Sequence, residues 1–427
     1  MTWLNRTIAV LQGAPIVLPA ATRDMLLVML WFFVTFKQFK YDELILYPLA
    51  LYFGWAFIRD INLIFPLIKR SWVLFLFPTW WFMSAIWAVD PALVIRSGLQ
   101  LLLTMMICYC AALRLEPRHI IFAMLVASCY FGFLSMMASF SGSGIAARGV
   151  FSSKNAMGAA MVILFMSSLV IVLDPKSNKL LRLASVGALA LSVRQIGVAN
   201  SATATLLMLA LGGMICAGAL MLRKGGLWHP AKLAVICGLI SLGSLGAGGY
   251  LSFQEVNPVE RVLASFGKDT TLTGRTDLWQ YALREIEERP LLGVGHGGFW
   301  TPEDGTSTAR RIYDDFHKRV YATFSFHNSY FEIAVHQGLI GLALAVIPVL
   351  WAFVRIIGAT LNRGGMEWLF FTGICFMNLA SSMTESALMV PFTLLSMTFW
   401  IGALMTLKLD DPVPKPERPR RLTMAHA

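Results

Sequence analysis

The sequence predicts an all-α integral membrane protein with about twelve transmembrane helices and one large, partly helical loop. Of its 427 residues, 57% are hydrophobic and only 14% are charged, whereas soluble domains carry about 25% charged residues. The mean hydropathy is +0.66. The apolar residues form runs of roughly 20, the length that an α-helix needs to cross about 30 Å of hydrocarbon. Each run therefore predicts a membrane span.

The apolar runs alternate with short charged spacers and divide the chain into five parts. The predicted spans cover residues 24–38, 41–59, 71–88, 92–113, 120–140, 156–174, 180–199, 201–222, 231–251, 331–357, 366–384 and 387–407. Residues 7–21 are also apolar and form either a signal-like or an interfacial segment, and we expect an uncleaved N-terminus. The predicted parts are an N-terminal segment (1–23), spans one to nine (24–251), a large loop (252–332), spans ten to twelve (333–407) and a basic tail (408–427).

The distribution of basic residues predicts the orientation in the membrane, because Lys and Arg in short loops are retained on the cytoplasmic side. Most of them follow even-numbered spans: Arg59, Lys69, Arg70, Arg114, Arg118, Lys176, Lys179, Arg182, Arg223, Lys224, Lys232, Arg355 and Arg363. Lys37 and Lys40 are exceptions. Both termini are then cytoplasmic, and the large loop faces outward, which is the periplasm in a Gram-negative cell. This topology explains the net charge of +11, so nucleic acid is not an expected partner.

The large loop is expected to fold, since it combines mixed charge with an amphipathic helical pattern. A helix is predicted from Thr276 and Asp277, the candidate caps, to Pro290, with Leu278, Ala282 and Ile286 on one face. The following segment, LLGVGHGGFW, is rich in turns. The Pro-rich basic tail is expected to be disordered at the anionic inner leaflet.

His327 and Asn328 directly precede an apolar helix that enters the membrane from the outside. The unpaired N–H groups of a helix N-terminus favour an anion, and His327 is placed beside them to donate or accept a proton. The alternative is that Asn328 or Ser329 caps the helix and His327 is a wet interfacial residue.

Several basic residues on the predicted outer side are candidates for binding an anion. Arg275 precedes the loop helix, and its planar guanidinium suits phosphate. Arg148 and Lys154, with Asn155, lie in an outward loop, where positive charge is usually depleted; they either bind a polyanion or snorkel to the headgroups. Taken by itself, Arg275 is better interpreted as a solvated surface residue.

Arg194 is predicted to lie inside the seventh span. A charge at that depth costs on the order of 2.5 to 3.5 kcal/mol, so it is expected to face the bundle interior or a water-filled cavity. Ser201 and Thr203 start the next span and either contact a ligand or serve as caps and packing hydroxyls. Glu385, an outward carboxylate near the membrane, is either functional or a helix cap.

Sequence motifs of metal, nucleotide or serine-hydrolase chemistry are missing, and no metal or cofactor is expected. HExxH, Walker, CxxC and GxSxG patterns do not occur. The six cysteines fall inside apolar runs, where cysteine behaves as a small hydrophobic residue.

These motifs resemble the superfamily of O-antigen ligases and bacterial polysaccharide polymerases. His327, Asn328, Gly338 and Gly341 match its signature of His, an amide or hydroxyl residue, nine residues, Gly, two residues and a small residue or Tyr. The blocks GVFSSKNAMG, TGRTDLW and RPLLGVGHGGFW are similar to family blocks in the same order, and the resemblance covers roughly residues 90–407. GRTDLW with GHGGFW is closer to the exopolysaccharide-polymerase branch.

The resemblance implies a metal-independent, inverting membrane glycosyltransferase with a fold like the C-type enzymes. Its donor would be a glycan on undecaprenyl diphosphate and its acceptor a sugar hydroxyl, in a protein of the bacterial inner membrane. The family's loop arginine falls on Arg275 and its signature histidine on His327. Many members have a basic residue where this chain has Ala202, so Arg194 would replace a diphosphate contact there.

Three functions follow as alternatives. The first is a polymerase that extends lipid-linked polysaccharide in exopolysaccharide or O-antigen synthesis, beside a flippase and a chain-length regulator. The second is an O-antigen ligase that attaches the polysaccharide to the lipid A core. The third is a transporter, although transporters tend to place ionisable residues near the midplane and to show repeats, which this sequence does not.

Overall fold

The computed structural model describes residues 20–37, 39, 41–140, 147–223, 275–301, 308–320 and 324–410, and the regular elements in these ranges are helices. In chain order they are α2 (Ala20–Phe36), α3 (Glu43–Arg59), α4 (Ile61–Arg70), η1 (Trp72–Phe75), α5 (Leu76–Met83), η2 (Ser84–Ile86), α6 (Pro91–Arg114), α7 (Pro117–Phe140), α8 (Lys154–Leu173), α9 (Lys179–Ala199), α10 (Ala202–Arg223), α13 (Arg275–Glu288), α14 (Thr308–Asp315), α15 (Ser329–Arg363), α16 (Met366–Thr384) and α17 (Leu394–Leu407).

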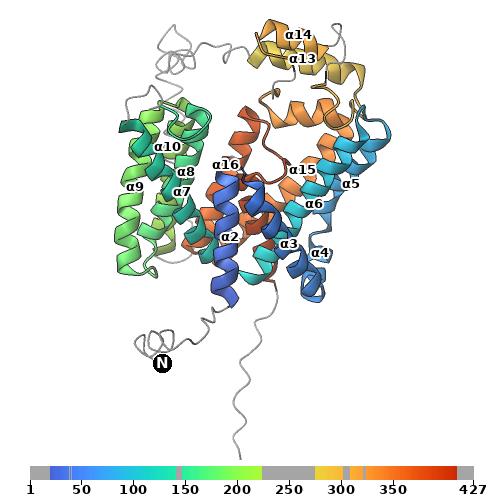
Figure 1. Ribbon diagram of the computed structural model, residues 1–427. Helices are drawn as coiled ribbons and strands as arrows, with labels where there is room; N and C mark the ends of the chain where they lie inside the picture. Colours follow the sequence, from blue (N-terminus) through green and yellow to red (C-terminus); the bar gives the residue numbers. More distant parts are fainter. Residues whose placement is uncertain are drawn as a thin grey trace, which may run out of the picture.

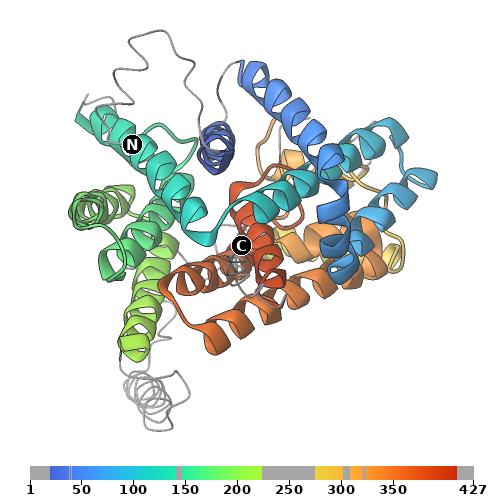
Figure 2. The ribbon, with the colours of Figure 1, turned by 90° about the horizontal axis from the view of Figure 1, so that it is seen from below.

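The helices form a bundle with α13 and α14 above one end (Figure 1). Helices α7 to α10 lie on one side, α3 to α6 and α15 lie on the other, and α2, α16 and α17 lie between them. Seen from below, the red C-terminal helix α17 is central (Figure 2), and all 14 of its residues are buried. It packs against α6, α15 and α16. The helix next to the C-terminus therefore forms the centre of the bundle.

Six of the described helices are long and apolar enough to cross a membrane, or seven if α3 and α4, which meet at an angle of 87°, count as one span. Helices α6 to α10 match their predicted spans to within a few residues. The predicted span at 231–251 lies outside the described residues, as does the apolar segment 7–21. The chain is thus a multi-pass helical membrane protein, while the count of twelve spans and their orientation stay predictions.

Besides 331–357, whose break at Gly338 is described below, two predicted spans are not continuous helices. Residues 71–88 form η1, α5 and η2 in series, and Pro78 within α5 removes a backbone donor. The predicted span 387–407 is helical only from Leu394. Pro391 lies in the preceding turn and disfavours helix at the residue before it.

The loop before α17 satisfies its backbone with side chains of other helices. The amide of Phe392 donates to Oγ1 of Thr104 at 3.1 Å, and the amide of Leu388 donates to Oγ of Ser329 at 3.1 Å. Irregular backbone at membrane depth is tolerated where such partners exist. The loop from Glu385 to residue 393 is thereby fixed against the start of α15.

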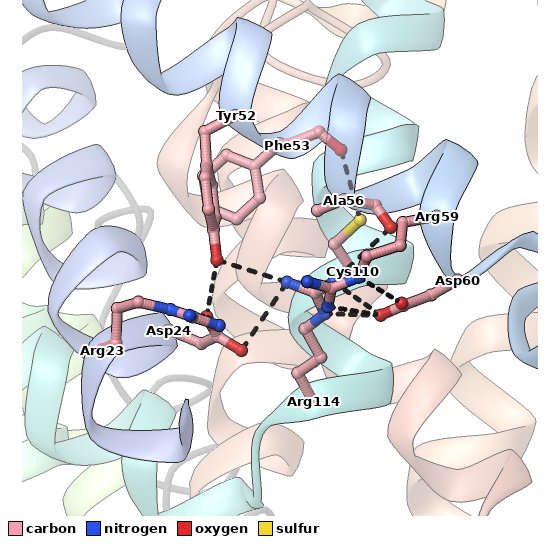
Figure 3. Close-up of polar contacts among 9 residues, drawn as sticks. All are labelled: Arg23, Asp24, Tyr52, Phe53, Ala56, Arg59, Asp60, Cys110 and Arg114. Carbon is pink, nitrogen blue, oxygen red and sulfur yellow. Dashed lines mark hydrogen bonds and ion pairs between the residues drawn. The ribbon is translucent and has the colours of Figure 1, made fainter. Parts of the chain in front are cut away.

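A buried polar cluster joins α2, α3 and α6 at the bend between α3 and α4 (Figure 3). The Arg114 side chain is 9% exposed and pairs with Asp60 and, at 3.6 Å, with Asp24. Tyr52 donates its hydroxyl to Asp24 at 2.7 Å. Buried charges need such partners, so Arg114, expected only as a cytoplasmic-side charge, also holds these helices together.

The described part of the large loop (residues 275–301, 308–320 and 324–328), called the outer loop after its predicted orientation, packs around an apolar core that it shares with the start of α15. Leu278 and Ala282 of α13 are buried in it, as predicted, together with Ile312 of α14 and Val335 of α15. Helix α13 begins at Arg275, so Thr276 and Asp277 lie within its first turn rather than at the cap. The shared core places α13 over the N-terminal part of α15.

Helix α15 is broken at Gly338, where φ is 68° and ψ is 179°. The turn that follows α13 supplies partners at this break: the amide of Leu339 donates to the carbonyl of Pro290 at 2.8 Å, and the amide of Val294 donates to that of Val335 at 3.0 Å. A side chain at Gly338 would collide with the carbonyl of Leu291. The break therefore lets the outer loop bind directly to the backbone of α15.

Candidate functional site

Arg275, His327 and Glu385 meet at the junction of the outer loop with the helix bundle. Nη2 of Arg275 donates to Oε1 of Glu385 at 3.2 Å, and Nδ1 of His327 lies 3.1 Å from Oε2 of the same carboxylate. The side chains are 21%, 36% and 47% exposed, respectively. One carboxylate thus connects the two residues that the sequence singled out for chemistry, and we call the three residues the Arg–Glu–His junction.

Three helix termini bring this junction together. Arg275 is the first residue of α13, and His327 comes just before Asn328, the N-cap of α15. Glu385 is the C-cap of α16, with its amide donating to Ser381 at 2.8 Å. Oγ of Ser329 donates to the carbonyl of Glu385 at 2.8 Å. The ends of α15 and α16 are therefore linked at the site itself.

Asn328 acts as a helix cap. Its Oδ1 accepts from the amides of Tyr330 at 2.9 Å and Phe331 at 3.3 Å, and its Nδ2 donates to the carbonyl of Met383 at 3.4 Å. The interpretation of Asn328 as a cap is therefore confirmed. A substrate contact of this residue stays a prediction.

The geometry of His327 constrains its chemistry. Its φ is 49°, a backbone conformation that is rare for residues other than glycine and recurs at functional sites. An ionised carboxylate only accepts hydrogen bonds, so the contact with Glu385 places the proton on Nδ1 and leaves the Nε2 lone pair available in the neutral ring. His327 can then accept a proton from a substrate hydroxyl.

A cavity of about 1130 Å³ is lined by Arg148 and Lys37 as well as by His296 of the outer loop. A second cavity of about 240 Å³ is lined by Ser325 and Ser386, the near neighbours of His327 and Glu385 in the chain. The two cavities share the lining residues Trp81, His296 and Val390. Arg148 therefore lines the larger cavity, and chain neighbours of His327 and Glu385 line the smaller one, whereas the three junction residues are not among the lining residues of either.

The remaining candidates near Arg148 make contacts within the bundle. Oγ of Ser201, which is 2% exposed, donates to Oδ1 of Asn155 at 3.0 Å and so ties α10 to α8. Lys154 is exposed at the start of α8, and Thr203 is half-buried in α10. This contact supports the packing interpretation of Ser201, and ligand contacts of Lys154, Asn155, Ser201 and Thr203 stay predictions.

The expectation that Arg194 faces the interior of the bundle is wrong. Arg194 is exposed on α9, and its Nη1 donates to Oε1 of the neighbouring Gln195, which is fully buried. Helix α9 lies at the edge of the molecule far from α13 and α15 (Figure 1). Hydropathy averaged over a window does not indicate which face of a helix a residue occupies. On α9, Gln195 rather than Arg194 points into the bundle.

Three polar residues at the site were not singled out from the sequence. Glu332 and His336 interact through Oε1 and Nε2 at 3.2 Å, and their spacing of four residues on a helix is a signal that could have found them. His296 packs its ring against Trp81, with centroids 3.8 Å apart. No pattern in the sequence brings His296 to α5.

The glycines of the family signature have a structural role. Gly338 makes the break in α15 described above. At Gly341, an added Cβ would lie 2.8 Å from Nε1 of Trp80, the atom that donates to the carbonyl of Gln337 at 3.0 Å. Both positions need a small residue because α5 and the outer loop approach the backbone of α15 closely.

The fold is that of a multi-pass helical membrane protein with an Arg–Glu–His junction at one end. Residues 187–346 match the family model described as O-antigen ligase, so this part of the chain is similar to that family. The match includes Arg275 and His327, whereas Arg148 and Glu385 lie outside it. The resemblance seen in the signature motif is therefore confirmed.

A relative in Rhizobium meliloti (strain 1021), the exopolysaccharide production protein ExoQ, is 31% identical over 282 residues. The matched region is 62% of this chain and 61% of the relative. The chain thus spans about three fifths of the length of that exopolysaccharide production protein.

Proposed function

We propose that this protein is a metal-independent membrane glycosyltransferase of polysaccharide biosynthesis in the bacterial inner membrane. It transfers a glycan from undecaprenyl diphosphate to a sugar hydroxyl with inversion, and it acts as a polymerase. The observation that carries the proposal is the shared contact of Glu385 with Arg275 and His327. This contact links Arg275, a cation that can hold an anionic leaving group, to His327, a base that can accept the proton of the attacking hydroxyl.

The proposed reaction is a single displacement. The acceptor hydroxyl gives its proton to Nε2 of His327 while its oxygen bonds to the anomeric carbon of the donor. The bond from that carbon to the diphosphate oxygen breaks, and the electron pair leaves with undecaprenyl diphosphate. Attack from the face opposite the leaving group inverts the anomeric centre, and Glu385 holds the His327 ring in the required orientation.

Arg275 stabilises the leaving diphosphate in this mechanism. A guanidinium has five N–H donors in a fixed fork, and it cannot be deprotonated, so it can hold a diphosphate while Nη2 faces Glu385. Arg148 and Lys37 line the large cavity, where they would attract the same anionic donor. A diphosphate already leaves readily, so cations contribute more here than a strong general acid.

Substitution of Arg275 and His327 tests the proposal. His327→Ala and Arg275→Ala are each expected to lower product by at least about 100-fold, since each removes a group that acts in the transition state. The readout is polymer formed by a complemented deletion strain, with membrane-inserted protein quantified in parallel. Wild-type product in either variant would remove that residue from the site.

An O-antigen ligase is the second candidate, favoured by the description of the matching family. Gel analysis of saccharides from a deletion strain separates the two. Loss of long chains with single repeats still attached to the acceptor supports the polymerase. Accumulation of long lipid-linked chains supports the ligase, and the Arg–Glu–His chemistry would be the same in both.

A further inference from the structure

Glu332, in the first turn of α15, makes four hydrogen bonds through one carboxylate. Oε1 accepts from Nε1 of Trp300 at 2.8 Å and faces Nε2 of His336 at 3.2 Å. Oε2 accepts from the amide of Phe326 at 2.8 Å and from Oγ of Ser386 at 3.2 Å. The carboxylate is 20% exposed. It thus connects the outer loop, the start of α15 and the loop after α16.

Two of these four partners are direct chain neighbours of the Arg–Glu–His junction. Phe326 precedes His327, and Ser386 follows Glu385. Because Oε2 of Glu332 binds both neighbours, it links the segment that carries the imidazole to the segment that carries its carboxylate partner, in addition to the contact of Ser329 with Glu385. The contact between Nδ1 of His327 and Glu385 depends on how these two segments are held together.

The backbone of His327 requires support from its surroundings. A positive φ at a residue with a side chain is energetically unfavourable and persists only where neighbouring contacts hold it. The amide of the preceding residue, Phe326, is held by Glu332, and Asn328 on the other side caps α15. Glu332 is therefore part of what keeps His327 in this conformation.

The carboxylate of Glu332 is itself held in place. Nδ1 of His336 lies 3.2 Å from the carbonyl of Gly295, which can only accept a hydrogen bond. His336 is 5% exposed and is thus fixed between the outer loop and Glu332. Trp300 and His336 hold Oε1 of Glu332 in place. Because the carboxylate group is rigid, they also fix Oε2, the atom that contacts Phe326 and Ser386.

We propose that Glu332 is a positioning residue that holds His327 and Glu385 in register without touching the substrate. The expected effect on the reaction rate rests on the proposed function. The expected effect on the position of His327 does not. Misplacement of reacting groups by about 1 Å can lower a rate about 100-fold. Loss of Glu332 is accordingly expected to lower kcat and to leave the KM for the donor within twofold.

The test compares Glu332→Ala and Ser386→Ala with Tyr281→Phe. Ser386→Ala removes one contact to Oε2 and retains the other three contacts of Glu332. It therefore tests the proposal even if Glu332→Ala does not fold. Tyr281→Phe is the matched control, because it removes a hydrogen bond of 2.6 Å to Asp315 in the same outer loop. Rates are measured in membranes of a deletion strain that contain the native lipid-linked repeat unit.

We expect kcat to fall about 100-fold in Glu332→Ala, to fall less in Ser386→Ala and to stay within twofold in Tyr281→Phe. A second readout, independent of activity, is the rate at which diethyl pyrocarbonate modifies His327, measured by peptide mass spectrometry; it should rise in both junction variants. Unchanged modification and kcat in folded Glu332→Ala, or a change in KM alone, overturns the proposal. Full activity of His327→Ala would instead overturn the proposed function.

Discussion

His296 is one of the side chains through which the outer loop contacts the bundle. Its ring lies against Trp81 of α5 and 5.9 Å from the ring of His336. Burial, together with the nearby His336, lowers the pKa of His296 from 6.5 to about 3. The ring is therefore neutral at physiological pH, and protonation would oppose the docking of the outer loop on α5.

The depressed pKa of His296 predicts how stability depends on pH. Below its ordinary pKa of 6.5 the unfolded chain binds the proton and the folded chain does not, so stability contributed by neutral His296 is lost as the pH falls from 6.5 toward 3. In His296→Gln this part of the pH dependence should disappear. Thermal unfolding of the detergent-solubilised protein between pH 8 and pH 4 measures it, and parallel curves for both proteins would contradict the prediction.

Local sequence made Arg275 and His327 candidates, because a helix N-terminus and a guanidinium have recognisable chemistry, and the resemblance to a family selected them among the alternatives. Glu385 was ambiguous, and it proves to be both a helix cap and the partner of the other two. Its contact with Arg275 joins residues that are 110 positions apart. The chemistry of a side chain can be read from its own position in the sequence, but its interaction partners depend on how the helices pack.

At the level of elements, the break in α15 positions the site. Gly338 has a positive φ, and the turn after α13 binds the backbone around it. The hydrophobic pattern predicted the helix correctly but not the break, since hydropathy does not report backbone dihedral angles. The family signature contains this glycine for a reason of conformation rather than of catalysis.

Two glycine substitutions in the same helix should have opposite effects. Gly338→Ala requires a positive φ and a Cβ that collides with Leu291, so it should lower the free energy of unfolding by more than about 1 to 3 kcal/mol. Gly358→Ala, with nothing within 4 Å of the added Cβ, should be neutral or slightly stabilising. Thermal unfolding midpoints of the two purified variants decide this, and equal midpoints would show that the break is not required.

At the scale of the whole molecule, α13 and α14 lie at one end of the bundle, and α4 lies toward the other (Figure 1). The polar cluster of Arg114 joins α2, α3 and α6 at the bend into α4. This arrangement fits the predicted topology, in which basic loops face the cytoplasm and the outer loop faces the periplasm.

Labelling with a membrane-impermeant thiol reagent tests that topology. Gln280→Cys in α13 and Lys176→Cys between α8 and α9 both alter exposed side chains. Intact spheroplasts should label only the first, and permeabilised ones should label both. The parent chain is the control for the native cysteines. Labelling of Lys176→Cys in intact spheroplasts would reverse the orientation.

The sequence alone determined that the chain lies in a membrane and where most of its helices begin and end, and its resemblance to a family pointed to Arg275 and His327 as candidates for a chemical role. These properties follow from the length of apolar runs and from the chemistry of single residues, which act over one or a few helical turns. Only the tertiary structure decided that Glu385 joins Arg275 to His327, that Glu332 holds their segments and that Arg194 lies outside. Such contacts depend on how kinked helices rotate and pack against one another, which no local pattern specifies.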